Sequence, residues 1–311
     1  MAEVRGKAVE RGLHLRERLS GPEASAERLG ALLIAPTVIL LVLIVGYPAF
    51  YNIYASFQYF VLTDPGTEHF IGLQNYTRVF SGVDSLSAWG RTILYTVISV
   101  AIQFVIGLVF ALAMHQNYRG RGVVRAAVLV PWAVPTVVSA LLWKTNFDPR
   151  IGFVNYLLGV AHLPGANTTW LNGVWTSWTV ILVADAWKNT PFLALILLSG
   201  LQVIPDDLYE QAQIDGAGIL RRFWYVTLPL LKPSIQVALI FRTLSAFLVF
   251  DVIYAITGGG PGNATNTVAF INWRAFLVDT DFGYGGAVSV VLTISALLIA
   301  VAYLRILRPS T

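Results

Sequence analysis

Residues 92–114 read TILYTVISVAIQFVIGLVFALAM, an uninterrupted run without a charged side chain. A helix that spans the hydrocarbon core of a bilayer needs about 20 mostly apolar residues. At a rise of 1.5 Å per residue, this run forms a helix about 35 Å long. The segment therefore predicts a transmembrane α-helix.

The composition of the whole chain agrees with a membrane protein. Of its 311 residues, 56% are hydrophobic and only 12% are charged, whereas soluble domains carry about 25% charged residues. A larger core does not explain the difference, because single cores stop growing near ~250–300 residues. The apolar excess must therefore face lipid. The chain has no cysteine, which excludes disulfides, cysteine metal sites and a thiol nucleophile.

Five further stretches have the length and apolar character of membrane spans. They are Gly30–Thr63 (most apolar over Ala31–Tyr47), Ala126–Trp143, Val174–Leu201, Ser234–Phe250 and Gly285–Leu304. In chain order, Val174–Leu201 is the fourth span and Ser234–Phe250 the fifth. Asp185 and Lys188 interrupt the fourth span and Arg242 interrupts the fifth, so these two spans have the weakest hydropathy signal. We predict an all-α membrane protein with six transmembrane helices.

The distribution of lysine and arginine predicts the orientation, because these residues gather in cytoplasmic loops. With both termini inside, the inner segments hold Arg5, Lys7, Arg11, Arg16, Arg18, Arg28, Arg119, Arg121, Arg125, Arg221, Arg222, Lys232, Arg305 and Arg308. The outer loops hold Arg78, Arg91, Lys144, Arg150 and Arg274. We therefore expect both termini in the cytoplasm, with residues 1–28 as a cytoplasmic tail and residues 29–311 as the transmembrane domain.

The connection after the fifth predicted span, on the outer side, reads TGGGPGN at residues 257–263 and must form a turn. The segment Thr267–Leu277 that follows is short and aromatic. It predicts a helix that lies at the membrane surface or dips partway into the membrane.

The inner loop at residues 202–233, between the fourth and fifth spans, has the pattern of two short helices. Pro205 and Asp206 give a helix-start signal, with acidic residues in the first turn and simple helix capping as the preferred role of Asp206 and Asp207. Leu208, Tyr209, Ala212 and Gln213 then share a helical face. Gly216 and Gly218 end this helix, and Ile219–Val226 predicts a second one. A helix–turn–helix on the cytoplasmic side is a surface suited to docking another protein.

The same loop resembles the signature of the permease subunits of binding-protein-dependent ABC importers. That signature is EAA, three residues, G, nine residues, then I-x-L-P. The chain has Glu210, Gln211 and Ala212, then Gly216, and then Val226, Leu228 and Pro229, with Gln211 in place of alanine and Val226 in place of isoleucine. The longer form typical of the carbohydrate-uptake branch matches further at Tyr209, Ile214, Asp215, Ala217, Phe223 and Thr227. Similar motifs are FIGLQNY at 70–76, PWAVP at 131–135, WKNTPF at 187–192 and FDVIYAITGGGP at 250–261.

This resemblance implies the fold of a type I ABC importer permease in the bacterial cytoplasmic membrane. It also implies that the loop couples the spans to a separate ATPase, with Tyr209, Glu210, Gln211, Ala212, Asp215, Gly216, Ala217 and Pro229 as the coupling residues. The implied partners are a cytoplasmic ATPase dimer, a second homologous permease and an extracytoplasmic sugar-binding protein, and no nucleic acid. The chain has no GxxxxGK[ST] phosphate loop. We therefore expect no enzymatic activity and no cofactor in this chain, with ATP and Mg²⁺ bound by the ATPase subunit.

Similarity to the maltose-importer permease implies a set of residues that contact substrate. They are Trp132, Lys188, Phe192, Arg242, Ala246 and Val249. Aromatic side chains suit the C–H faces of sugar rings, although packing or an interfacial belt also explains aromatic residues in a membrane protein. Because that relative has small polar residues at Arg242, Ala246 and Val249, the substrate does not transfer. A di- or oligosaccharide such as trehalose or maltose is the leading prediction. A phosphorylated polyol such as glycerol 3-phosphate is the alternative, since Lys188 and Arg242 suit an anion.

Charged residues inside a membrane are costly and by default indicate function. Asp185 and Lys188 are three residues apart on one helical face and are placed to pair with each other. Arg242 either lines the pathway or pairs with an acid. Asp251, at the outer end of its span, is placed to cap it.

Three other classes of protein have less support. Stand-alone secondary transporters usually show internal repeats and more spans, and neither is found here. A membrane-embedded enzyme needs clustered catalytic groups, but His14, His69, His115 and His162 are scattered. A purely structural subunit leaves the cytoplasmic loop unexplained.

Overall fold

The computed structural model describes residues 22–306 and divides the chain into two compact units, residues 1–55 and 56–311. Most of the predicted tail at residues 1–28 lies outside the described residues. Within those residues, five helices are long and apolar enough to cross a membrane, and a bent helix pair brings the number to six. The predicted six-span, all-helical architecture is therefore confirmed.

The first unit is one nearly continuous helix. It consists of α2 (Pro22–Leu41), a π-helical turn, η1 (Val42–Gly46), and α3 (Tyr47–Ser56). The apolar span within it is Leu32–Ser56, and none of its most apolar window is buried inside the unit. The span ends before the predicted Thr63, because the chain turns at Phe57 into the short strand β1.

The second unit begins with a two-stranded antiparallel hairpin and continues as helices. Its elements are β1 (Gln58–Tyr59), β2 (His69–Phe70), α4 (Gln74–Ser81), α5 (Val83–His115), α6 (Arg121–Ala133), α7 (Thr136–Asn146), α8 (Phe153–Val160), α9 (Val174–Leu201), α10 (Asp206–Ile214), α11 (Ile219–Arg222), η2 (Phe223–Thr227), α12 (Leu228–Phe247), α13 (Asp251–Ile256), α14 (Val268–Leu277) and α15 (Phe282–Ile306).

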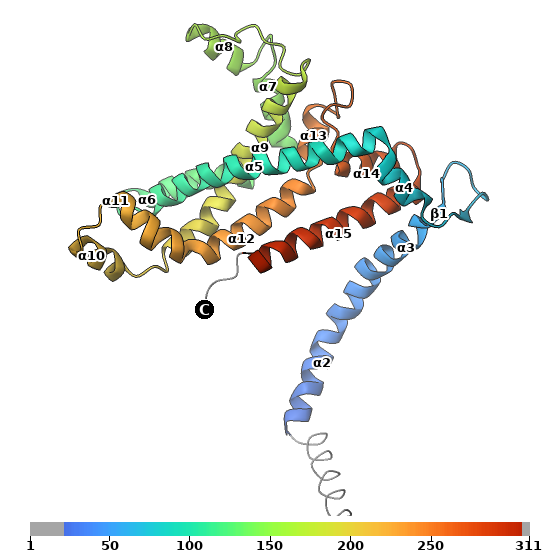
Figure 1. The fold of residues 1–311 in the computed structure, drawn as a ribbon, viewed down its shortest axis with the longest axis horizontal. Helices are drawn as coiled ribbons and strands as arrows, with labels where there is room; N and C mark the ends of the chain where they lie inside the picture. The colour runs from blue at the N-terminus through green and yellow to red at the C-terminus, as the bar shows by residue number, and fades with distance from the viewer. Residues whose placement is uncertain (1–21, 307–311) are drawn as a thin grey trace, which may run out of the picture. The chain divides into compact units, whose positions relative to one another are not determined.

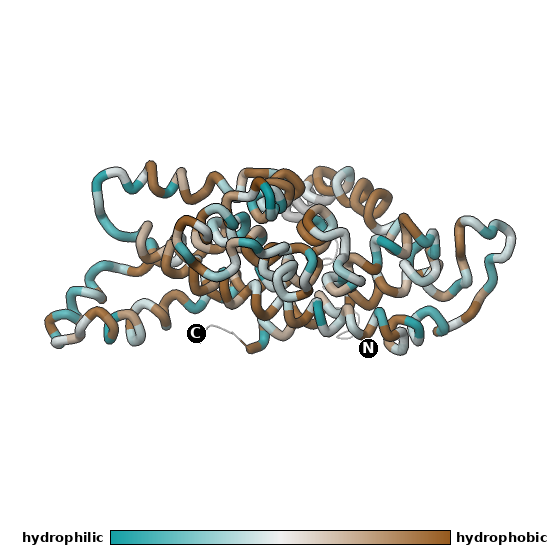
Figure 2. The backbone as a smooth tube through the Cα atoms, turned by 90° about the horizontal axis from the view of Figure 1, so that it is seen from above, coloured by the Kyte–Doolittle hydropathy of each residue, from teal (hydrophilic) through white to brown (hydrophobic). Residues whose placement is uncertain are grey.

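The centre of this unit is the packing of α5, α9 and α12. α12 contacts both α5 and α9 and also packs against α15 (Figure 1). Leu193, Leu197 and Leu201 recur every fourth residue along one face of α9 and are fully buried against Met114 of α5 and Leu231 of α12. In Figure 2 the helices of this unit are predominantly brown, and the hydrophilic teal stretches gather in the connections. Apolar side chains therefore both build the interior and cover the outside of these helices.

The third predicted span, Ala126–Trp143, is broken rather than straight. Its two halves, α6 and α7, meet at an angle of 94° around Val134. Pro135 explains the break, because proline has no backbone N–H to donate and disfavours a helical residue before it. Val134 accordingly adopts an extended conformation, with φ −71° and ψ 131°.

The fourth span, α9, has the predicted bounds, whereas the second, fifth and sixth are longer than predicted. The fifth differs most, because α11, η2 and α12 form one helix over Ile219–Phe247. The predicted separate helix at Ile219–Val226 is thus the first part of the span. Pro229 lies in the first turn of α12, directly after the π-helical turn η2, where the hydrogen bonding of the helix already changes. Pro233 lies inside α12, one turn later.

The short aromatic segment after the glycine-rich turn is helical, as predicted. Thr267 caps α14, accepting a hydrogen bond at its side chain from the Phe270 N–H, and α14 packs against α5 and α15. Asp251 does not cap the preceding span; it lies in the first turn of the separate helix α13.

Close helix packing predicts a cost for enlarging Gly200. A Cβ atom at Gly200 would lie 2.5 Å from Ser234 Cβ and 2.8 Å from Leu231 Cδ1 of α12. We expect Gly200→Val to destabilise the protein by about 1–3 kcal/mol through overpacking, measured as a lower melting temperature of the purified protein. Gly90→Val is the matched control, since nothing lies within 4 Å of that position. Equal melting temperatures for the two variants would contradict the packing described.

Candidate functional site

A buried ion pair joins the three central helices. Arg242 of α12 donates through Nη2 to Asp185 Oδ2 of α9, and the two side chains are only 7% and 6% exposed. The alternative that Arg242 pairs with an acid is therefore correct. The expected pairing of Asp185 with Lys188 is wrong, because Arg242 approaches Asp185 from the neighbouring helix.

Polar side chains of α5 complete this network. Ser99 Oγ donates to Asp185 Oδ2 over 2.6 Å and accepts from Arg242 over 2.8 Å. Gln103 Nε2 also donates to Asp185 Oδ2, at 2.8 Å, and Asn189 Nδ2 donates to Asp185 Oδ1 at the same distance. Both carboxylate oxygens are thus hydrogen-bonded, as a charge removed from water requires.

The network still has unused hydrogen-bonding capacity. Among the described residues, Arg242 Nε and Gln103 Oε1 are buried without a hydrogen-bond partner. Ser99 and Gln103 were not predicted as site residues. The available signal was that Ser99 and Gln103 are four residues apart, and so lie on one helical face, in the uncharged run at 92–114.

Lys188 contacts the broken third span instead of Asp185. Its Nζ donates to the carbonyl oxygens of Val134 and Trp132, at the break between α6 and α7. Backbone carbonyls released from helical hydrogen bonding are costly in a membrane unless a neighbour satisfies them. Lys188 therefore supports the break in the third span.

Aromatic side chains flank the network on the side of this break. Trp132 stacks on Phe192 with ring centroids 5.3 Å apart and planes inclined by 11°. Phe192 meets Phe241 edge-on at 6.3 Å. A small cavity of about 40 Å³ is lined by Phe192, Phe241 and Arg242, together with Asn189 and Ser245.

The structure thus brings four of the six predicted substrate residues together: Trp132, Lys188, Phe192 and Arg242. The other two, Ala246 and Val249, are buried in the adjoining core with Ile181 and Ile253. Contact of all six with substrate stays a prediction.

The predicted coupling loop forms the expected helix–turn–helix. Gly216, with φ +78°, ends α10 in a left-handed conformation that glycine adopts readily. Its N–H bonds to the Gln213 carbonyl, and the N–H of Ala217 bonds to the Ala212 carbonyl, which is the Schellman arrangement of a helix C-terminus. The predicted side-chain capping at the start of α10 is absent from the described structure; Pro205 is the N-cap, and Asp206 and Asp207 lie in the first turn, where they favour the helix dipole.

One face of the loop is anchored and the other is free. Tyr209 packs against the α9–α12 core, and its hydroxyl is 3.1 Å from Thr227 Oγ1. Glu210 is exposed, and so are Gln211 and Asp215, whereas Ala212 and Ala217 are half-buried. Apolar side chains also point to solvent, with Ile214 86% and Ile219 78% exposed. An exposed acid beside exposed isoleucines on a short, anchored helix has the features of a protein-docking surface.

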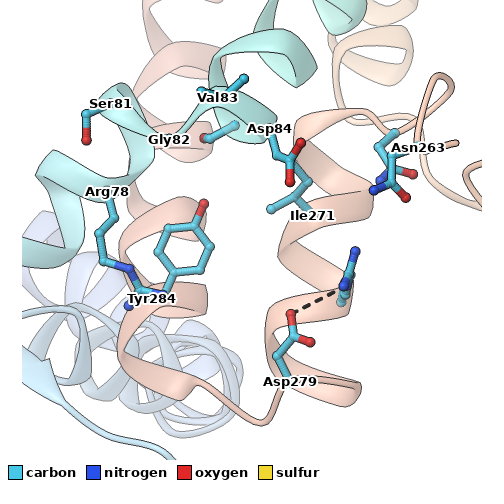
Figure 3. Close-up of a pocket in the computed structure, with 12 residues that line it drawn as sticks. Arg78, Ser81, Gly82, Val83, Asp84, Asn263, Ile271, Asp279 and Tyr284 are labelled. Carbon is cyan, nitrogen blue, oxygen red and sulfur yellow. Dashed lines mark ion pairs between the residues drawn. The ribbon is translucent and has the colours of Figure 1, made fainter.

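A polar pocket of about 440 Å³ lies at the N-terminal ends of α5 and α15. Figure 3 shows Arg78 and Tyr284 beside one another, with Asp84 and Asp279 across the opening. Arg78 stacks 4.5 Å from the Tyr284 ring centroid and pairs with Asp281 at 3.0 Å, and Arg274 pairs with Asp279 at 3.5 Å. No local sequence pattern predicts this pocket, because its residues come from three separate segments.

Helical spans around a buried polar network, with an anchored loop of exposed acidic and apolar side chains at one end, are features of a membrane permease. Residues 103–311 match the family described as binding-protein-dependent transport system inner membrane component, and the chain belongs to that family.

Similar proteins cover nearly the whole chain. It is 40% identical to the trehalose/maltose transport system permease protein MalF of Thermococcus litoralis, over 90% of this chain and 94% of that one. It is also 40% identical to the sulfoquinovosyl glycerol transport system permease protein SmoG of Agrobacterium fabrum, over 90% of each. The fold resembles a chain of a bacterial alginate ABC transporter, solved with an alginate pentasaccharide-bound periplasmic protein, with a TM-score of 0.80, 21% identity and coverage of 93% and 97%.

The ion pair generates a stability prediction. We expect Asp185→Asn and Arg242→Gln each to destabilise the protein by about 3–5 kcal/mol, because each leaves a buried charge without its partner. The double variant, which removes both charges, should recover at least half of that loss. Melting temperatures of the purified variants measure this, and a double variant as unstable as the sum of the two single variants would show that the charges are not coupled.

Proposed function

We propose that this chain is one permease subunit of an ATP-driven importer that carries a neutral di- or oligosaccharide, such as trehalose or maltose, through the bacterial cytoplasmic membrane. The observation that supports a neutral substrate best is that Lys188 and Arg242, the two cations beside the aromatic residues, are both engaged. Asp185 neutralises Arg242, and two backbone carbonyls hold the ammonium group of Lys188. The surface left beside them is the aromatic group of Trp132, Phe192 and Phe241, which suits sugar rings. The trehalose/maltose permease relative supports the same class of substrate.

The second candidate is an anionic polyol or glycoside, including glycerol 3-phosphate. The similarity to a permease for sulfoquinovosyl glycerol, a sulfonated glycoside, favours it. Binding of an anion requires Arg242 to release Asp185 and pair with the substrate instead. Arg242 Nε, which has no hydrogen-bond partner among the described residues, would donate to the anion first.

Coupling would run from the exposed loop to the spans. In this proposal α10 docks on a cytoplasmic ATPase dimer that binds ATP and Mg²⁺, and Glu210 and Ile214 contact that partner. The anchoring of Tyr209 at Thr227 transmits the movement, because Thr227 belongs to the same continuous helix as Arg242. Closure of the ATPase dimer would thus reach α12 directly and, through the ion pair, α5 and α9. Both termini then lie in the cytoplasm, as the distribution of arginine and lysine predicts.

On the outer side, the polar pocket is the proposed contact for an extracytoplasmic binding protein that delivers the sugar. Its charges of both signs suit the polar rim of a transient interface. A second homologous permease would complete the pathway. In the single chain Trp132 and Phe241 are about half exposed, and the partner would cover the open side of these rings.

The coupling proposal predicts which variant loses the ATPase. We expect Glu210→Lys combined with Gly216→Pro to abolish co-purification of the ATPase with a C-terminally tagged chain, because the first reverses a charge and the second removes the left-handed turn. Glu68→Lys is the control, an exposed glutamate outside the loop. Quantitative mass spectrometry of the gently extracted complex measures the result. Retention of the ATPase by the double variant, or purification of a lone wild-type chain that transports without ATP, would contradict the proposal.

The aromatic residues predict a change in the apparent affinity for sugar. We expect Trp132→Ala or Phe192→Ala to raise the KM of sugar uptake about tenfold, because stacking contributes about 0.5–1.5 kcal/mol beyond the buried area. Trp175→Ala, at an exposed tryptophan near the start of α9, is the matched control. Initial rates in intact cells over a range of sugar concentrations separate KM from the maximal rate. Loss of maximal rate at unchanged KM would indicate packing rather than substrate contact.

A further inference from the structure

A large apolar groove lies in the angle between α6 and α7. It has a volume of about 760 Å³, within the range of about 300–1,000 Å³ of ligand sites. Ile106 and Phe110 of α5, Val124 and Val128 of α6, Trp143 of α7 and Trp187 of α9 are among the residues that line it. We call it the elbow groove. It is separate from the small cavity beside Arg242, with which it shares no lining residue.

One end of the elbow groove lies near the C-terminal end of α5 and the N-terminal end of α6. Phe110 lies five residues before the end of α5, and Val124 lies three residues after the start of α6. From there the groove follows α5 back to Ile102, a rise of about 12 Å. That depth is close to half of the ~30 Å hydrocarbon core. Along α9 the lining runs from Pro191 back to Thr179, a rise of about 18 Å. The groove thus has roughly the depth of one leaflet.

Two tryptophans form part of the wall farther along the groove. The rings of Trp143 and Trp187 meet edge-on with centroids 6.0 Å apart, where α7 packs against α9 after the 94° turn. A flexible acyl chain fits a long apolar groove of this volume, because it can follow the bent wall that α6 and α7 form.

The end of the groove near Val124 is strongly basic. Arg121 precedes Val124 by three residues and Arg125 precedes Val128 by three, so both arginines share a face of α6 with groove residues. Arg121 donates to Asn117 and Arg125 to the Met114 carbonyl, which are neutral groups. The chain has no acidic residue from 85 to 147, and Asp185 of α9 is held by Arg242. None of the ion pairs among residues 22–306 involves Arg119, Arg121 or Arg125.

We propose that the elbow groove binds an anionic phospholipid, with one acyl chain between α5, α6 and α9 and the phosphate group at Arg121 and Arg125. Basic residues at the mouth of a groove between transmembrane helices are the arrangement that recognises such headgroups, and the apolar walls supply the burial of the chain. The lipid fills the angle that the break at Val134 leaves open and so supports the bent span. In the proposed orientation the lipid belongs to the cytoplasmic leaflet.

Photocrosslinking of the intact purified complex tests the site. Nanodiscs would contain phosphatidylglycerol or phosphatidylcholine with a diazirine in one acyl chain, and labelled peptides would be located by mass spectrometry. We expect phosphatidylglycerol to label residues of the elbow groove about fivefold more than phosphatidylcholine, since one basic residue near an anionic surface has an effect of that size.

Two matched pairs of variants separate the headgroup from the acyl chain. Arg121→Gln should reduce labelling by phosphatidylglycerol about fivefold and leave labelling by phosphatidylcholine unchanged, whereas Arg305→Gln, at an exposed arginine at the end of α15, should change neither. Ala127→Phe, which fills the groove, should reduce labelling by both lipids, whereas Ala126→Phe, on an exposed neighbouring position that does not line the groove, should not.

Three outcomes would overturn the proposal. They are equal labelling by the two lipids, labelling unaffected by Arg121→Gln and Ala127→Phe, and crosslinking of a photoreactive residue at position 127 to a second permease subunit instead of lipid. Because labelling needs neither sugar nor ATP, the result is independent of whether the chain imports a sugar.

Discussion

The ion pair between Asp185 and Arg242 is the interaction on which the rest of the structure depends. Two opposite charges deep within apolar helices are stable only as a pair and only with their remaining hydrogen-bonding groups satisfied. Meeting that requirement brings three helices together, since the carboxylate belongs to α9, the guanidinium to α12, and Ser99 and Gln103 to α5. Any movement of one helix must therefore either carry the other two along or separate the charges.

The π turn, Lys188 and Trp132 connect the helices around this ion pair. The π turn and proline residues at the start of the fifth span lead from the exposed loop into α12 without a break. Lys188, one turn from Asp185, attaches α9 to the break between α6 and α7, and Trp132 at that break faces Phe192 of α9. The charged groups thus fix the helices, and in the proposed function the aromatic groups form the surface that a neutral solute contacts. A lipid in the elbow groove would support the same break from the outside.

Much of this could be predicted from the sequence, and the failures have physical causes. Length and hydropathy identify the spans, because the hydrocarbon core excludes most polar side chains. The spacing of Glu210, Gly216 and Pro229 predicts the helix–turn–helix, and its coupling role stays a proposal. The partner of Asp185 could not be predicted, because proximity along one helix favours Lys188 while the actual partner lies on another helix. The break at Val134 was missed because hydropathy does not register backbone geometry, although Pro135 was a signal for it. The polar pocket at the N-terminal ends of α5 and α15 joins segments that are distant in sequence, so no local pattern could reveal it.

Transport by a reconstituted complex tests the central claim most directly. The chain would be incorporated in proteoliposomes with its ATPase and second permease, with ATP enclosed on the ATPase side and the binding protein added on the other. Radiolabelled trehalose, maltose and glycerol 3-phosphate would be compared. The account predicts ATP-dependent accumulation of a neutral sugar, lost without ATP or without the binding protein. Uptake of sugar that needs neither ATP nor the binding protein, or ATP-dependent uptake of glycerol 3-phosphate alone, would contradict it.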